Sequence, residues 1–159
     1  MKILLFSDSH NLTSNMKKAI EKEENVSIII HLGDCVRDIL KIKMKYPQFS
    51  YVYVNGNNDW LMDESSEKVI FFNNKKILIS HGHLYSVKSG YGKLIKRGVE
   101  IGADAVFFGH THKTEETYVD KMLLLNPGSV MLSDNLGIPS WCTIEVVDEK
   151  FKVKFNSIS

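Results

Sequence analysis

Residues 1–10 read MKILLFSDSH, and the pattern of this stretch decides the fold. Its four consecutive apolar residues, 3–6, are typical of a strand that is buried on both faces. Similar apolar runs follow at 26–30 and 51–54. The segments between these runs carry helix caps or helical apolar spacing and are predicted to be helices, at 16–22 and 36–46. The order strand, helix, strand, helix, strand predicts a parallel sheet with crossover helices.

The second half of the chain shows a different pattern. A helix is predicted over 89–101, where Gly102 ends it, and a buried strand over 105–108. Three pairs of short apolar runs flank turn residues and predict hairpins: 69–72 with 76–79, 117–119 with 122–125, and 141–147 with 151–155. We therefore expect an α/β beginning followed by mostly antiparallel strands, in which two packed sheets with helices outside bury the apolar runs.

Length and composition predict one domain spanning residues 1–159. The 20 basic and 19 acidic residues nearly balance, which argues against a partner bound through bulk charge, such as nucleic acid or an anionic membrane. The first apolar run is too short for a signal peptide or a membrane span. Two cysteines, Cys35 and Cys142, cannot form a four-cysteine zinc site, and reduced thiols predict a cytoplasmic protein.

Metal-capable side chains follow five of the predicted strands at the point where each strand ends. In open α/β sheets ligands gather outside the C-terminal strand ends, so these side chains can converge on one cleft. Gly-Asp or Gly-Asn-Asn-Asp alone is more often an ordinary turn, and His-x-His is a stronger signal that alone is no better than even. However, five of the six histidines lie in or beside these loops. The candidates, in chain order, are Asp8 and His10, then Asp34, then Asn57, Asn58 and Asp59, then His81 and His83, then His110 and His112.

The types of side chain indicate the type of metal. Carboxylate, amide and imidazole ligands without thiolate suit manganese, iron, zinc, nickel or cobalt rather than a structural zinc site. Several histidines argue against a pure magnesium or calcium site. The ligands are too many for one ion and fit two ions that share a carboxylate. Two ions roughly 3.5–4 Å apart can clamp a phosphoryl group and generate a bridging hydroxide.

The motifs that carry these side chains stand in a recognisable order: Asp8-x-His10, Gly33-Asp34, Gly56-Asn57-Asn58-Asp59, His81-Gly82-His83 and Gly109-His110-x-His112. Together they resemble the calcineurin-like metallophosphoesterase superfamily. The small size and the segment Asn126-Pro127-Gly128-Ser129, expected to be a turn that packs against the cleft, resemble its compact phosphodiesterase branch. The resemblance covers residues 1 to about 130.

The resemblance implies a fold and a metal centre. The family fold is an α/β two-sheet αββα sandwich with a dinuclear metal site at the C-terminal ends of the strands. By resemblance, Asp34 bridges the two metals. The cofactors implied are two divalent ions, Mn²⁺ in the first place, with Ni²⁺, Zn²⁺, Fe²⁺ or Co²⁺ as alternatives. The first metal is held by Asp8, His10 and His112, and the second by Asn57, His81 and His110.

The activity implied is that of a dinuclear metal-dependent phosphodiesterase, which hydrolyses small phosphodiesters by in-line attack of a metal-bridging hydroxide. Asn58 stands where many members carry a histidine that aids the leaving group, and an amide cannot deliver a proton at neutral pH. We therefore expect weaker catalysis on esters with poor leaving groups. Asp59 is predicted to orient an imidazole. His83 either contacts phosphate or is a surface residue, and His31 either supports the ligands or is packed in the core.

The main alternative is a non-catalytic scaffold of the same fold, as in a eukaryotic retromer subunit. A scaffold is expected to lose ligands, whereas all seven metal positions are filled here. A small-molecule phosphate ester is thus the expected partner, with no membrane or nucleic acid, and a homodimer or homotetramer is possible. The basic residues in 88–97 either face phosphate or lie on a solvated helix face. Trp60, Leu61 and Met62 are apolar residues in an expected loop, and we expect them to line the substrate pocket or to form a subunit contact.

Overall fold

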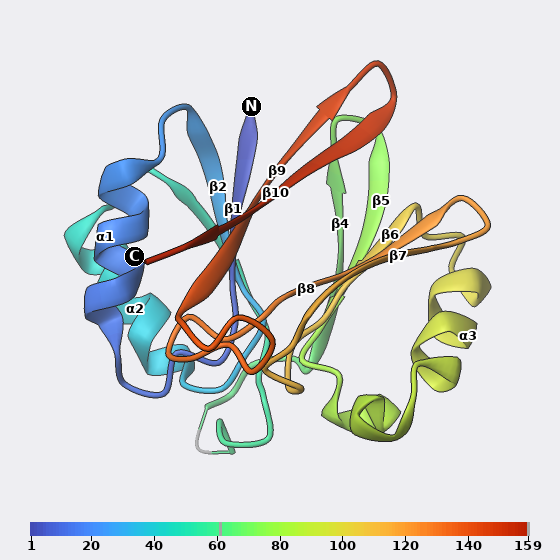
Figure 1. Cartoon of the computed structure of the whole chain (residues 1–159), viewed down its shortest axis with the longest axis horizontal. Coiled ribbons are helices and arrows are strands. Elements are labelled where there is room, and N and C mark those ends of the chain that lie inside the picture. Colours follow the sequence, from blue (N-terminus) through green and yellow to red (C-terminus); the bar gives the residue numbers. More distant parts are fainter. Residues whose placement is uncertain (61, 159) are drawn as a thin grey trace.

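The computed structural model describes residues 1–60 and 62–158, so the predicted contact of Leu61 lies outside the described residues. The first 53 residues form the predicted β-α-β-α-β unit (Figure 1). Its elements are β1 (Lys2–Phe6), α1 (Thr13–Lys22), β2 (Val26–His31), α2 (Val36–Lys45) and β3 (Ser50–Tyr53). The three strands are parallel, as predicted from their unbroken apolar runs. Both helices pack on one face of this sheet, where Leu4, Phe6 and Ile29 meet Met16 and Ile39.

A hairpin from the far end of the chain completes this first sheet. β9 (Ser140–Val147) and β10 (Lys150–Ser157) are antiparallel, and β9 lies antiparallel to β1. The strand order is therefore β10-β9-β1-β2-β3. The hairpin itself was predicted from its turn residues, whereas its pairing with β1 joins segments that are far apart in the sequence.

The second sheet has the order β4-β5-β6-β8-β7. Two of its hairpins were predicted, but the expectation of mostly antiparallel strands was wrong for its centre. β6 lies parallel to β5, because a helical crossover returns the chain to the same end of the sheet before β6 begins, and it also lies parallel to β8. The strands are β4 (Glu67–Phe72), β5 (Lys75–Ser80), β6 (Ala105–Phe107), β7 (Thr114–Val119) and β8 (Met122–Pro127).

The crossover from β5 to β6 is shorter and more broken than the helix predicted over 89–101. The α-helix α3 is Gly92–Glu100, and two 3₁₀ turns precede it, η1 (His83–Tyr85) and η2 (Val87–Ser89). Gly90 has φ 134° and ψ 169°, which no helix contains, so the α-helix starts after it. The two short turns keep this segment close to the ends of the strands.

The two sheets pack face to face and bury a core between them, with helices on both outer faces (Figure 1). α3 covers the outer face of the second sheet, where Leu94 packs with Leu78 and Val106. The predicted αββα sandwich is confirmed. Each fully buried apolar side chain of the central core contributes about 1.5–3 kcal/mol to folding. These side chains include Ile3, Leu5, Ile30, Ile79, Phe107 and Leu125, all with 0% exposure.

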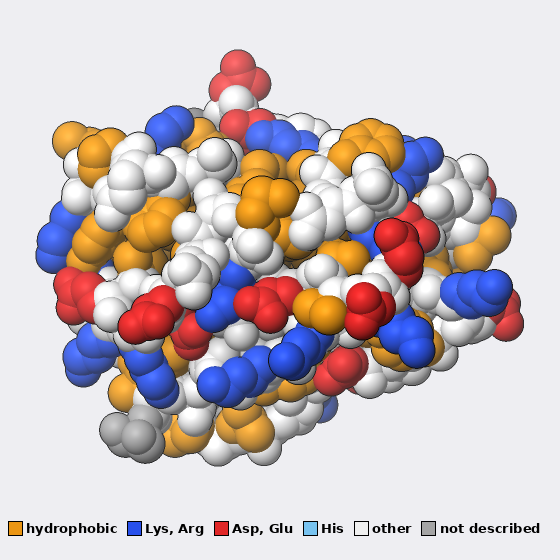
Figure 2. Space-filling model, turned by 90° about the horizontal axis from the view of Figure 1, so that it is seen from above, with side chains coloured by type: hydrophobic (Ala, Val, Ile, Leu, Met, Phe, Trp, Pro, Cys, Tyr) orange, Lys and Arg blue, Asp and Glu red, His pale blue; other side chains and the backbone are white. Residues whose placement is uncertain are grey.

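The C-terminal ends of β1, β2, β3, β5 and β6 lie at one end of the sandwich, the lower end in Figure 1. The loops that follow these strands therefore meet. Figure 2 views the molecule from above, and on this face Lys and Arg side chains are interspersed with Asp and Glu, as the net charge of +1 suggests. Among the residues described, no helix is long and apolar enough to cross a membrane.

Candidate metal centre

The loops after four strands bring two groups of metal-capable side chains together. In each group the ligand atoms lie within 4.8 Å of one another. The first group is Asp8, His10 and His112, and the second is Asp34, His81 and His110. The structure thus places six of the seven predicted metal ligands in two clusters. The seventh, Asn57, lies beside the second cluster, with Oδ1 3.0 Å from Nε2 of His81.

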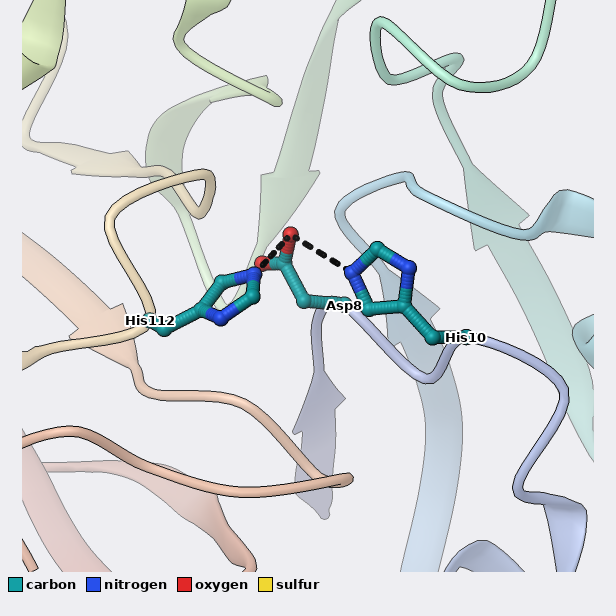
Figure 3. Close-up of side chains that lie close together, drawn as sticks. All are labelled: Asp8, His10 and His112. Atoms are coloured by element: carbon teal, nitrogen blue, oxygen red, sulfur yellow. Dashed lines mark ion pairs between the residues drawn. The ribbon is translucent and has the colours of Figure 1, made fainter.

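In the first group the two imidazoles face one carboxylate oxygen (Figure 3). Nε2 of His112 is 3.3 Å and Nε2 of His10 is 3.8 Å from Oδ1 of Asp8. The other oxygen, Oδ2, accepts hydrogen bonds from Ser7 Oγ at 2.5 Å and from the His110 amide at 3.1 Å. Asp8 Oδ1 and His10 Nε2 are both buried without a hydrogen-bond partner. Two buried lone pairs that face each other fit a cation between them.

In the second group His81 is held in one tautomer. Its Nδ1 lies 2.8 Å from the carbonyl oxygen of Leu32, which can only accept, so Nδ1 carries the proton. Nε2 then presents a lone pair to Asn57 Oδ1 at 3.0 Å and to Asp34 Oδ1 at 3.5 Å. His110 Nδ1 is 3.2 Å from the same Nε2. Acceptors crowded in this way need a cation or a proton among them, so these residues fit a divalent ion.

Asp34 lies between the two groups. One of its oxygens, Oδ1, is 3.5 Å from Nε2 of His81, and the other, Oδ2, is 3.8 Å from Nε2 of His10. A carboxylate with one oxygen toward each set of imidazoles has the arrangement that a shared ligand requires. The geometry is thus the one expected of the bridging residue.

The electrostatics of the site keep both carboxylates ionised. Burial disfavours the charge of Asp8, but the proximity of His112, whose Nε2 is 3.3 Å from Oδ1, and the charge of His81 lower its pKa overall. Burial likewise opposes the charge of Asp34, but the proximity of His81 and the two hydrogen bonds from Asn58 lower its pKa. For His81, burial is outweighed by Asp34 and Asp8, which raise its pKa. The pocket of carboxylates therefore attracts positive charge at the position where ions are expected.

Strained backbone accompanies these ligands. Five of the six clustered residues have φ between 44° and 70°, a region that residues other than glycine rarely adopt. They are Asp8, His10, Asp34, His110 and His112. Such strain persists only where the surrounding structure enforces it, and its concentration on one set of ligands indicates a functional site.

Asp59 supports the site through the backbone rather than through an imidazole. Its two oxygens accept hydrogen bonds from four amides at 2.8–2.9 Å. The donors are the backbone amides of Asp34, Cys35, Val36 and Gly56. The carboxylate therefore ties the loop that carries Asp34 to the loop after β3 and caps the N-terminus of α2.

Asn58, which stands at the position of the missing histidine, binds the carboxylate of Asp34. Its backbone amide donates to Oδ1 at 3.0 Å and its side-chain Nδ2 to Oδ2 at 2.8 Å. Both oxygens of Asp34 are thereby oriented toward the imidazoles. The side chain is exposed, but it is engaged with the ligand rather than free to reach a leaving group.

His31 belongs to a buried network that sequence reasoning did not find. Its Nδ1 accepts the Gly33 amide at 3.1 Å, so Nε2 carries the proton and donates to Ser9 Oγ at 2.9 Å. Ser9 in turn donates to Asp38 at 2.6 Å, and the Asn11 amide donates to the same carboxylate oxygen. The network holds the loop that contains Asp8 and His10. Asp38 carried no signal in the sequence, because an acidic residue in the first turn of a helix is common.

His83 is half-buried beside the second group. The centre of its ring is 5.4 Å from that of His81 and 6.2 Å from that of His110, and its Nδ1 is buried without a hydrogen-bond partner. Burial and the charge of His81 lower its pKa, so the ring is neutral at pH 7. The ring thus lies beside the second group, and its contact with phosphate stays a prediction.

The segment 126–129 packs against the metal loops, as expected. Asn126 and Pro127 end β8, and the chain turns after them. Asn126 Nδ2 donates to the Gly109 carbonyl and to Thr111 Oγ1, both at 3.1 Å. Ser129 Oγ donates to the Asp8 carbonyl at 2.8 Å. The segment thus braces two of the loops that carry ligands.

Two clefts are lined in part by residues of the loops that carry the metal ligands. One of about 420 Å³ has His110 and His112 in its wall, and the basic residue Lys88 lines it. Arg97, from the same basic segment, instead pairs with Glu67 at 2.8 Å. The second cleft, of about 210 Å³, is lined by residues that include Asn58, Trp60 and Met62. The structure thus places Trp60 and Met62 on a cleft wall next to the centre.

The protein is thus an α/β protein with two sheets in an αββα sandwich and two clusters of candidate Asp and His metal ligands at the strand ends. A profile of the calcineurin-like phosphoesterase superfamily domain matches residues 1–149. The chain belongs to this family.

Individual relatives agree with the family assignment. The phosphodiesterase MJ0936 of Methanocaldococcus jannaschii is 34% identical over 168 residues, covering 96% of this chain and 95% of the relative. The crystal structure of a predicted phosphoesterase from Streptococcus pneumoniae TIGR4 superposes with a TM-score of 0.85 at 26% identity, covering 98% and 88%. Zinc-bound Vps29 of Entamoeba histolytica superposes with a TM-score of 0.77 over 99% of both chains, and at 22% identity this likeness shows the fold alone.

Proposed function

We propose that this chain is a metal-dependent phosphodiesterase that holds two divalent ions and hydrolyses small phosphodiesters. The observation that carries the proposal is Asp34, which presents one oxygen to each of two clusters of imidazoles. The unpartnered buried atoms Asp8 Oδ1 and His10 Nε2 support a cation in the first cluster. A relative that is 34% identical bears the name phosphodiesterase, which supports diesters as the substrate class.

The side chains divide the work between ligation and support. Asp8, His10 and His112 would hold one ion, and Asn57, His81 and His110 the other, with Asp34 shared. Divalent ions bound there supply an activated water and offset the negative charge of the phosphoryl group. We propose Mn²⁺ as the native ion, because carboxylate, amide and imidazole ligands suit it, and Ni²⁺, Zn²⁺, Fe²⁺ or Co²⁺ also fit this set.

Around the ligands, Asn58 orients Asp34, Asp59 fixes the Asp34 loop, and His83 contributes a neutral imidazole toward the phosphate. Because Asn58 is engaged with Asp34 and cannot deliver a proton, esters with good leaving groups are the favoured substrates.

The test is hydrolysis of bis(p-nitrophenyl) phosphate and p-nitrophenyl phosphate by metal-stripped protein, with Mn²⁺, Ni²⁺, Zn²⁺ or Mg²⁺ added back. We expect metal-dependent cleavage that prefers the diester. In Asp34→Asn and His81→Ala the rate falls at least about 100-fold, since even residues that only support ligands cost 10–100-fold. Asp120→Asn, at an exposed turn with φ 52°, is the matched control and keeps the wild-type rate.

Metal content, measured by mass spectrometry and compared with turnover, distinguishes an enzyme from a non-catalytic scaffold of the same fold. Folded protein that binds two ions yet turns over neither ester would contradict the enzyme and favour the scaffold. A cytoplasmic location and a homo-oligomeric state stay predictions, and sedimentation equilibrium checks the second.

A further inference from the structure

The larger cleft beside the metal centre has a chemical character of its own. Its volume is about 420 Å³, and two of its lining residues, His110 and His112, are metal-ligand candidates. A substrate whose phosphate lies on the metal centre therefore has this cleft as its neighbouring space. The rest of the wall is formed by Val87, Lys88, Tyr91, Thr111, Lys113 and Asp134.

Two lysines in this wall lack acidic partners. Within the described part of the chain, neither Lys88 nor Lys113 has a carboxylate within 4.0 Å, whereas Lys2, Lys68 and Lys75 each pair with a glutamate. One carboxylate, Asp134, faces the cleft against these two cations. The lining therefore keeps a net positive charge that is available to a ligand.

Both lysines stand on short, fixed turns. Lys113 directly follows the ligand His112, and its backbone amide donates to Thr111 Oγ1 at 3.1 Å. Lys88 lies in η2, which the buried Val87 anchors to the core. Their backbones are thus placed relative to the metal ligands by tertiary contacts.

Tyr91 gives the cleft a rigid apolar wall. Its ring packs edge-on against Phe108, with ring centroids 5.0 Å apart, and its hydroxyl donates to Glu115 at 3.2 Å. A linker between two anionic groups of a ligand could lie against this ring while each end meets positive charge.

We propose that Lys88 and Lys113 form a second anion subsite, so that the preferred substrate is a phosphate ester that carries another anionic group. The inference rests on the proposed function for the position of the reacting phosphate. A phosphate or a carboxylate satisfies the charge, since a lysine ammonium is a point charge that does not select a planar ligand.

Binding tests the subsite without relying on turnover. Calorimetric titrations of the protein, with and without Mn²⁺, compare three ligands of one length: propyl phosphate, 3-phosphonooxypropanoate and propane-1,3-diyl bisphosphate. We expect the bisphosphate to bind roughly tenfold tighter than propyl phosphate, since each exposed ion pair contributes about two- to fivefold. The carboxylate ligand shows whether a single negative charge is sufficient. Added salt should reduce the discrimination.

Variants assign the effect to the two lysines. The relevant quantity is the ratio of the affinity for the bisphosphate to that for propyl phosphate. The double variant Lys88→Gln/Lys113→Gln should bring this ratio close to one, and Lys88→Arg/Lys113→Arg should preserve it. The control Lys93→Gln/Lys96→Gln removes two exposed lysines of α3 that do not line this cleft, and it should leave the ratio unchanged.

The subsite would be overturned by equal affinities for all three ligands in the wild type, or by a ratio that the double glutamine variant does not change. An equal loss in the control pair would also do so, since it would assign the effect to overall charge. Retained discrimination in a protein that hydrolyses no ester would refute the proposed function and leave the subsite standing.

Discussion

Two histidines of this chain are fully buried, and their neighbours give them opposite properties. Burial lowers the pKa of His31 to about 4, although Asp8, Asp38 and Asp59 partly oppose the shift. Burial acts in the same direction on His81, but the close carboxylates of Asp34 and Asp8 outweigh it and raise the pKa. His31 is thus a neutral structural residue, and His81 sits where a positive charge is favoured.

His31 predicts a pH dependence of stability. Its folded pKa of about 4 lies below the usual 6.5, so between these values the unfolded state binds more protons and the free energy of unfolding falls as the pH falls. Between pH 7 and pH 5 this group removes about 2 kcal/mol. In His31→Gln that part of the decrease should vanish. Urea unfolding of the metal-free wild type and variant at both pH values measures the difference, and identical decreases would contradict the assignment.

At the scale of elements, the loops after β2 and β3 are in backbone contact. A Cβ atom added to Gly56 would lie 2.2 Å from Asp34 Oδ1 and 2.5 Å from the Asp34 amide nitrogen. The four hydrogen bonds that Asp59 accepts join the same two loops. The position of the shared carboxylate therefore depends on the absence of a side chain at residue 56.

Gly56→Ala should displace Asp34 and weaken metal binding at least about tenfold, the lower range for a disturbed ligand environment. Gly92→Ala is the matched control, because a Cβ there meets no atom within 4 Å and the residue begins α3. That change should leave metal affinity intact and stabilise the protein by about 0.4–1 kcal/mol. Metal titration and thermal unfolding give both numbers. An unchanged metal affinity in Gly56→Ala would contradict this prediction, because it would show that the two loops can move apart without disturbing the ligands.

At the scale of the whole molecule, the core between the sheets holds the two halves of the site together. Asp8 and Asp34 come from the first sheet, and His81, His110 and His112 follow strands of the second. The distances across the centre are therefore set by the side chains that fill the space between the sheets.

Leu125→Ala tests this core. Leu125 has 0% exposure and lies in the cluster between the sheets, so the cavity should lower the free energy of unfolding by about 2–5 kcal/mol. Val99→Ala, at a side chain 64% exposed on α3, should change it by less than about 0.5 kcal/mol. Urea titration of both variants at pH 7 makes the comparison. Similar small decreases of the free energy of unfolding in both variants would mean that the packed sheets tolerate a cavity at residue 125.

The unbroken apolar runs predicted the parallel unit of β1, β2 and β3, and turn residues predicted the three hairpins, because these features depend on neighbours in the sequence. The five motifs likewise predicted which side chains gather at the strand ends, since parallel strands bring their C-terminal ends to one edge.

Contacts between distant segments decided the rest. The parallel pairing of β6 with β8, the placement of β9 beside β1, and the engagement of Asn58 with Asp34 all join parts of the chain that no local pattern relates. The cleft lined by Lys88 and Lys113 is of the same kind. Local preferences select elements and ligand types, whereas packing of the two sheets selects which elements are neighbours and which way each side chain is held.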